Sequence, residues 1–94
     1  MLNKKTYTNG QKVYELIDDI LTYFYKNGQL KARGKYVNEQ MEGQWQFYRE
    51  NGQLWQVGNF LSNKKHGHWL RYDRSGNQEY SAYFDDNKLI KQEK

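Results

Sequence analysis

Two histidines and two pairs of aspartates are the residues of this 94-residue chain whose types and spacing could support metal binding or acid–base chemistry. His66-Gly67-His68 brackets a predicted turn, but neighbouring strand positions point to opposite sides, and no cysteine or carboxylate lies within a few residues to complete a metal shell. Asp18-Asp19 and Asp85-Asp86 fall in predicted turns, where aspartate is favoured because its side chain hydrogen-bonds the backbone. We therefore expect two solvent-exposed histidines, two turn-forming aspartate pairs and no metal site.

Catalytic motifs are missing from the sequence. No nucleophile has a base at motif spacing, and the glycines recur as hairpin turns rather than as a phosphate-binding loop that enters a helix. We therefore predict that the protein has no catalytic residue, binds no cofactor and is not an enzyme.

A basic stripe beside an aromatic residue is the strongest binding signal. Lys31, Arg33 and Lys35 alternate along one predicted strand, which places them on one face, and Trp55 is expected nearby on the neighbouring strand. Such a stripe could bind nucleic acid, where cations meet phosphates and rings stack on bases, an anionic membrane surface, or an acidic patch on a protein. It could also be a solvated outer face whose lysines prevent sheet aggregation.

Two features favour a protein partner over nucleic acid. The net charge is a modest +4, and the same predicted face carries the apolar residues Trp55, Val57 and Leu61. Protein interfaces favour aromatic and arginine anchors at such places. The apolar residues could instead pack against a second copy of the chain, so homodimerisation competes. The candidate partner-binding residues are Lys31, Arg33, Lys35, Trp55, Val57 and Leu61.

The elements that position these residues are tandem repeats. Gly28, Gly52 and Gly76 lie 24 residues apart, and three units follow, at residues 19–42, 43–66 and 67–90. A shortened capping repeat (1–18) precedes them and a tail (91–94) follows, all in one domain. Such a period predicts an array in which each unit buries its apolar face against its neighbours. The structural repeat positions are Gly28, Gly34, Trp45, Tyr48, Gly52, Gly58, Phe60, Trp69, Tyr72, Gly76 and Phe84.

Turn chemistry predicts that each unit is a β-hairpin. Asn27-Gly28 and Asn51-Gly52 supply the positive φ of a tight turn between aromatic and β-branched segments. The second connections are short and polar, so the hairpins join into a single-layer, all-β antiparallel meander of about seven strands. The N-terminal part adds a capping strand that turns at Asp18-Asp19.

Period-two alternation divides each long strand into two faces. A repeating core face is expected to hold Leu54, Gln56, Gly58 and Phe60, with Leu30 to Tyr36 and Gln78 to Phe84 as the equivalents. Its small residues, Gly34, Gly58 and Ala82, leave room for a large ring, for which Trp45 and Trp69 are the candidates. Trp55, Val57, Asn59 and Leu61 are predicted to occupy the opposite face.

Composition predicts a folded protein of a reducing compartment. Aromatic residues make up 17% of the chain, which is unlike a disordered chain, and there is no cysteine to form a disulfide. Residues 1–10 have lysines but no following apolar stretch, and no run approaches the ~20 apolar residues of a membrane helix. We expect a soluble, cytoplasmic protein.

The repeat residues resemble a known family. Gly-Gln-Trp-Gln-Phe-Tyr (43–48), Glu-Asn-Gly-Gln-Leu (50–54), Gly58 and Phe60 resemble the MORN-variant repeat, and the match recurs at 67–76 and, more weakly, at 21–36. Bacterial proteins built from this variant are commonly named YwqK-family antitoxins. The resemblance implies an antitoxin or immunity protein that binds and neutralises a cognate toxin. The alternative is a scaffold or membrane-tethering assembly protein. The first unit departs from the pattern at Asp19 and Leu21, and the last departs at Gln78.

Overall fold

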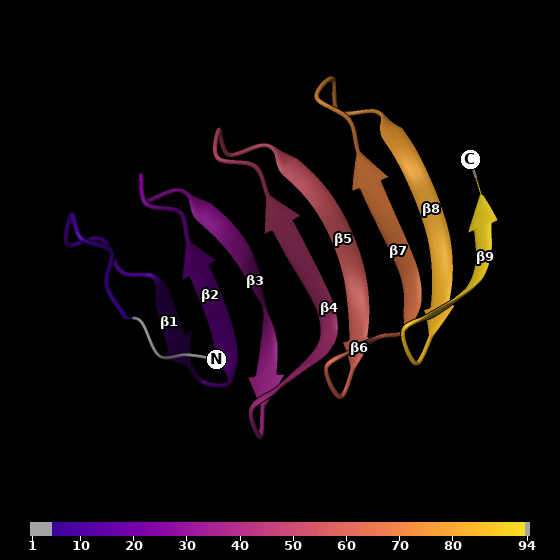
Figure 1. The fold of residues 1–94 in the computed structure, drawn as a ribbon, viewed down its shortest axis with the longest axis horizontal. Helices are drawn as coiled ribbons and strands as arrows, with labels where there is room; N and C mark the ends of the chain where they lie inside the picture. Colours follow the sequence, from indigo (N-terminus) through magenta and orange to yellow (C-terminus); the bar gives the residue numbers. More distant parts are fainter. Residues whose placement is uncertain (1–4, 94) are drawn as a thin grey trace.

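The protein is one layer of antiparallel β-sheet (Figure 1), described by a computed structural model over residues 5–93. Hydrogen-bonded neighbours follow the order β1-β2-β3-β4-β5-β7-β8-β9, and β6 pairs with β5 beside this path. The molecule measures 41 × 34 × 19 Å. The predicted all-β, single-layer meander is therefore confirmed. The strands are β1 (Tyr14–Ile17), β2 (Ile20–Phe24), β3 (Leu30–Val37), β4 (Gln40–Tyr48), β5 (Leu54–Leu61), β6 (Lys64–Lys65), β7 (Gly67–Tyr72), β8 (Gln78–Asp85) and β9 (Lys88–Glu93).

The described residues form nine strands, where about seven were predicted. One difference is β9, which includes residues 91–93 that were expected to be a tail; residue 94 lies outside the described residues. After a two-residue turn the chain runs back beside β8 and pairs with it as β9. This pairing satisfies the N–H and C=O groups on an edge of β8 that would otherwise be unpaired. The other difference is the short strand β6, which is separated from β7 by His66. The His66 amide donates to the Asn59 carbonyl oxygen at 3.0 Å. At this point the pairing with β5 changes register between β6 and β7.

The two ends of the hairpins use different turns. At one end, Gly28, Gly52 and Gly76 have φ of 89°, 93° and 87°, as the Asn/Ser-Gly pattern predicted. These loops are wide, since the Tyr25 amide donates to the Gln29 carbonyl. At the other end, both residues of each two-residue turn have positive φ without any glycine, which matches the twist of the strands. The tightest turns are thus the polar connections Asp18-Asp19, Asn38-Glu39, Ser62-Asn63 and Asp86-Asn87.

Tryptophan rings laid over glycines form much of the core, as predicted, and the fully buried Leu21 belongs to it as well. A Cβ atom at Gly34 would lie 2.2 Å from the Trp45 ring, and one at Gly58 would lie 2.1 Å from the Trp69 ring. The indole N–H of Trp45 donates to the Lys35 carbonyl at 3.0 Å, and that of Trp69 makes the equivalent bond at 2.9 Å. Trp45 is fully buried and Trp69 is 2% exposed. Each ring therefore fills the space left by the glycine of the preceding repeat.

Successive repeats are joined by side chains that follow the strands before the wide loops. The Tyr25 hydroxyl donates to the Tyr48 carbonyl at 2.7 Å, and the Arg49 guanidinium donates to the Tyr72 carbonyl at 2.9 Å. Tyr7 makes the equivalent bond to Phe24 at 2.8 Å, ahead of β1. The predicted N-terminal strand is present, because β1 pairs with β2 around the turn at Asp18 and Asp19.

One part of the face prediction is wrong. The pairing shifts by one residue where each wide loop joins its strands, so Lys31 and Trp55 are extra residues on β3 and β5. A β-bulge of this kind breaks the strict alternation of side chains. The predicted core face therefore holds from Ala32, Gln56 and Tyr80 onward, whereas Leu30, Leu54 and Gln78 precede the bulges and are out of phase with it.

Candidate binding site on the aromatic face

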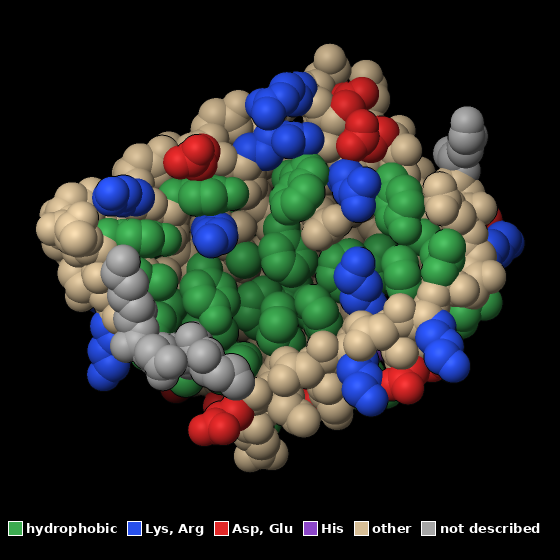
Figure 2. All heavy atoms as spheres, viewed as in Figure 1, with side chains coloured by type: hydrophobic (Ala, Val, Ile, Leu, Met, Phe, Trp, Pro, Cys, Tyr) green, Lys and Arg blue, Asp and Glu red, His purple; other side chains and the backbone are tan. Residues whose placement is uncertain are grey.

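One face of the sheet carries a continuous layer of aromatic rings. Phe47 stacks between Trp45 and Trp69, with ring centroids 6.2 and 6.0 Å apart, and Phe60 packs edge-on against both tryptophans. Phe47 and Phe60 are half-buried, since residues 5–93 form no second layer that covers them. Hydrophobic side chains fill the middle of this face, with Lys and Arg side chains among them (Figure 2). We call it the aromatic face.

Cations of the aromatic face lie on its rings. The Lys65 ammonium is 4.8 Å from the ring centroids of both Trp69 and Phe84, and the Arg71 guanidinium is 4.6 Å from that of Tyr80. Such contacts are favourable because the ring faces carry partial negative charge. The face is therefore both apolar and positively charged.

The bulges divide the predicted binding residues between the two faces. Lys31 and Trp55 line a hollow together with the core residues Ala32 and Phe47, so they belong to the aromatic face. Arg33 lies between two buried core-face residues of β3 and points to the other side. The same alternation places Lys35, Val57 and Leu61 on that opposite face. The predicted three-residue basic stripe, and its grouping with Trp55, Val57 and Leu61, are therefore wrong, because the bulges turn Lys31 and Trp55 over.

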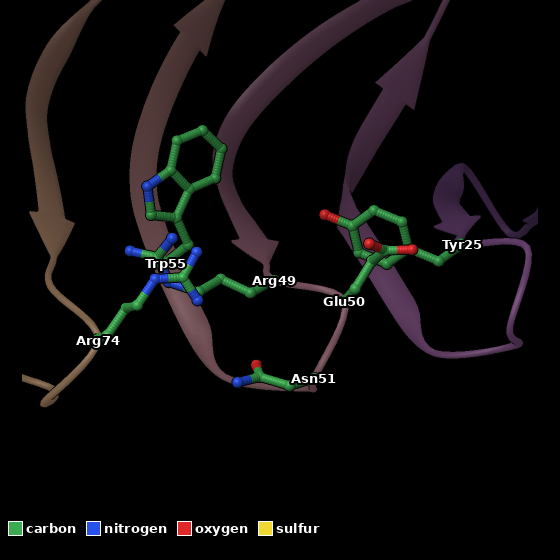
Figure 3. Close-up of a pocket in the computed structure, with 6 residues that line it drawn as sticks. All are labelled: Tyr25, Arg49, Glu50, Asn51, Trp55 and Arg74. Carbon is green, nitrogen blue, oxygen red and sulfur yellow. The ribbon is translucent and has the colours of Figure 1, made fainter.

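A polar hollow of about 380 Å³ opens where the wide loops meet the aromatic face. In Figure 3 the side chains of Arg49 and Arg74 point toward Trp55. The Arg49 guanidinium carbon lies 5.8 Å from the Trp55 ring centroid. Two arginines from neighbouring repeats thus converge on one indole. The lining residues are Tyr25, Arg49, Glu50, Asn51, Trp55 and Arg74.

An apolar hollow of about 250 Å³ adjoins the polar one. Tyr25 and Trp55 line both hollows, so the two share a wall. Tyr23, Ala32 and Phe47 line the apolar hollow, and the Lys31 ammonium lies 5.6 Å from the Tyr25 ring centroid beside it. An apolar cavity beside convergent polar groups is the usual form of a binding site.

One of the side chains that line the polar hollow, Arg49, has a buried donor without a partner in the described part of the chain. Arg49 donates from Nη2 to the Tyr72 carbonyl, yet its buried Nε has no hydrogen-bond partner among residues 5–93. A buried N–H without an acceptor costs about 1–3 kcal/mol.

Raising the pH through about 10 is expected to destabilise the protein more than its Tyr25→Phe variant. Burial raises the pKa of the Tyr25 hydroxyl above 10.0, Glu50 acts in the same direction, and Arg49 opposes it. Because the pKa in the folded state is above that of the unfolded chain, the unfolded chain loses the proton first. The neutral Tyr25 hydroxyl therefore makes its full contribution to the free energy of unfolding below about pH 10. This contribution is lost as the pH rises through the folded-state pKa. Urea unfolding at pH 8 and pH 11 measures the loss in both proteins, and an equal loss would contradict the assignment.

The opposite face carries the two histidine-containing contacts. His66 is exposed, as predicted, and its Nδ1 lies 3.5 Å from the Asp85 carboxylate. His68 is half-buried rather than solvent-exposed, because its ring stacks on Tyr83 at 4.4 Å and its Nε2 lies 2.8 Å from the Ser81 hydroxyl oxygen. Ser81 is only 3% exposed, so its hydroxyl is not accessible to a substrate. We interpret this contact as packing rather than as a nucleophile with its base.

Three of the four paired aspartates lie in the turns where they were predicted. Asp18 and Asp19 both occupy a turn with positive φ, as predicted, and so does Asp86. Asp85 instead ends β8. Within residues 5–93, no group of three or more metal-ligating side chains is close enough to hold an ion.

Sequence reasoning missed Arg49, Arg74, Tyr25 and Glu50. All four lie at the wide loops, which were interpreted only as turns. The repeat alignment could have indicated two of them. Tyr25 and Arg49 lie 24 residues apart at equivalent repeat positions, and both side chains hydrogen-bond to the next repeat.

Comparison with known proteins identifies the repeats. The sequence pattern of the MORN repeat variant matches residues 20–38 and 41–61. The chain carries MORN-variant repeats. The two matched segments cover β2–β3 and all but the first residue of β4–β5, the hairpins that form most of both hollows. No curated protein matches the chain.

MORN repeats generally mediate protein binding and are typically non-catalytic. The open aromatic face is consistent with such a module. In residues 5–93, no helix has the length and apolar character needed to span a membrane.

Proposed function

We propose that this protein is a non-catalytic binding module whose aromatic face contacts a protein partner, and that the partner is a toxin which it neutralises by direct contact. The binding role is supported by one observation above all. The outer rings of the aromatic layer, Phe47 and Phe60, are half-buried, and two adjoining hollows open on the same face of a single-layer sheet. Aromatic and arginine side chains of this kind dominate the energetics of protein interfaces.

The toxin is proposed from the resemblance of the MORN-variant repeats to those of YwqK-family antitoxins. A small sheet with an open face suits this role, because neutralisation by direct binding requires only that a surface of the toxin be covered. We place the complex in the cytoplasm, since a chain without cysteine fits a reducing compartment.

The membrane-tethering form of the alternative loses the three-residue stripe on which it was based. It depended on Lys31, Arg33 and Lys35 as one stripe, and Lys31 lies on the aromatic face while Arg33 and Lys35 lie on the other. Two cations on one strand face attract an anionic bilayer less strongly than three.

The test is to recover the tagged protein from its native cells at moderate salt and identify what co-purifies. We expect a stoichiometric partner with a toxin domain, encoded by the neighbouring gene, whose harm to growing cells disappears on co-expression. Recovery of membrane proteins, or of the chain alone, would count against the proposal.

A further inference from the structure

The two hollows of the aromatic face have complementary chemistry. The apolar hollow, lined by Tyr23, Ala32 and Phe47, has room for one aromatic or branched aliphatic side chain. The polar hollow beside it holds Arg49 and Arg74. Because Tyr25 and Trp55 line both, a ligand can occupy the two hollows at once.

The charges around the hollows are not neutralised by the protein. Lys31, Arg49 and Arg74 face them, against the single carboxylate of Glu50. The ion pairs of residues 5–93 lie elsewhere, and none includes these three cations. The Tyr72 carbonyl accepts a hydrogen bond from Nη2 of Arg49 at 2.9 Å and holds this guanidinium beside the polar hollow. The site is thus complementary to an anionic group.

We propose that these hollows bind a short acidic segment of the partner protein, with a carboxylate between Arg49 and Arg74 and a neighbouring apolar side chain in the apolar hollow. Side chains two positions apart in an extended chain lie on one side. The recognised pattern is therefore Asp or Glu separated by one residue from Phe, Tyr, Trp, Leu or Ile. This inference depends on the proposed protein-binding function and specifies the chemistry of the partner.

A protein segment fits better than the other anionic partners. Nucleic acid would need cations spread along its backbone, whereas these three gather at one end of one face. A flat bilayer surface would meet the exposed cations without entering an apolar hollow of about 250 Å³. A single side chain can enter it.

The experiment is affinity selection of random twelve-residue peptides displayed on phage against the full-length protein. Binding of the selected peptides is then measured by fluorescence anisotropy at low and moderate salt. We expect enrichment of the acidic–x–apolar pattern, and binding that weakens with salt because charge attraction contributes to it. Arg74→Glu should weaken binding at least tenfold, because the residue is exposed and its side chain lines the polar hollow.

The matched control is the double variant Arg33→Glu/Lys35→Glu, which reverses charge on the opposite face and should bind the peptides as well as the wild type. Thermal unfolding of both variants checks that the sheet is intact. Selected peptides without acidic enrichment, or with affinity unchanged by Arg74→Glu, would overturn the inference, as would a selection that yields no binding peptide. Saturable binding of phosphatidylserine vesicles that is lost in Arg74→Glu would overturn it in favour of a membrane. Each of these results can occur while a toxin still co-purifies, so failure here is distinguishable from failure of the proposed function.

Discussion

Replacing Trp45 by alanine is expected to lower the free energy of unfolding by about 3–5 kcal/mol, the usual cost of removing a buried tryptophan. The Trp45 side chain has a relative solvent exposure of 0%, its ring covers Gly34, and its indole N–H donates to the Lys35 carbonyl at 3.0 Å. A domain of this size is stabilised by about 5–15 kcal/mol in total. The loss is therefore a large fraction of the whole, and urea unfolding followed by far-UV circular dichroism measures it.

Trp55→Ala is the matched control for that measurement. Trp55 is half-buried and lies at a bulge beside the hollows, so its removal leaves the Gly34 and Gly58 contacts intact. We expect a loss of about 1 kcal/mol, typical of a point substitution that opens no core cavity. Equal losses in the two variants would contradict the view that the tryptophans over glycines form the core.

Replacing Gly58 by valine is the second change with a large expected effect, about 3 kcal/mol, at the upper end of the usual cost of overpacking. The added Cβ would lie 2.1–2.3 Å from three carbons of the Trp69 ring. The ring cannot swing away without breaking its 2.9 Å hydrogen bond to the Asn59 carbonyl. The melting temperature should fall accordingly.

A double-mutant cycle isolates the cause. Trp69→Leu shortens the clashing side chain to the type that Leu21 supplies in the first repeat, so adding Gly58→Val to it should cost at least about 1 kcal/mol less than in the wild type. Ala82→Gly, a large-to-small change at the equivalent position, should cost more than the backbone entropy of about 0.5–1 kcal/mol, because the buried Ala82 methyl group is also lost. An unchanged melting temperature in Gly58→Val would mean that the faces of β5 are assigned the wrong way round.

The fold could be predicted from the sequence because its repeats contain the same contact more than once. Gly34 and Gly58 recur with Trp45 and Trp69, and a glycine that recurs on a strand beside a large ring indicates that the ring packs over it. The polar pairs such as Asn38-Glu39 marked the second turns, although their geometry is tighter than that of the Asn-Gly loops. Local chemistry therefore determined the architecture.

The site could be predicted only in part, because alternation assumes that no residue is inserted. Lys31 and Trp55 are the extra residues of bulges and turn to the aromatic face. Lys31 and Trp55 lie at equivalent repeat positions, but one is basic and the other aromatic. Their residue types therefore did not indicate that both positions are bulges. Arg74 lies in a loop and approaches Trp55 from the next repeat, a proximity that only the folded sheet creates.

The most direct test of the central claim, that the aromatic face is the surface a protein partner covers, is co-purification from native cells with three versions of the tagged protein compared by quantitative mass spectrometry. These are the wild type, Trp55→Ala, and Arg33→Glu/Lys35→Glu. We expect one stoichiometric partner that is retained by the opposite-face variant and lost from Trp55→Ala. A partner that is retained by Trp55→Ala and lost from Arg33→Glu/Lys35→Glu would contradict the claim and assign binding to the opposite face.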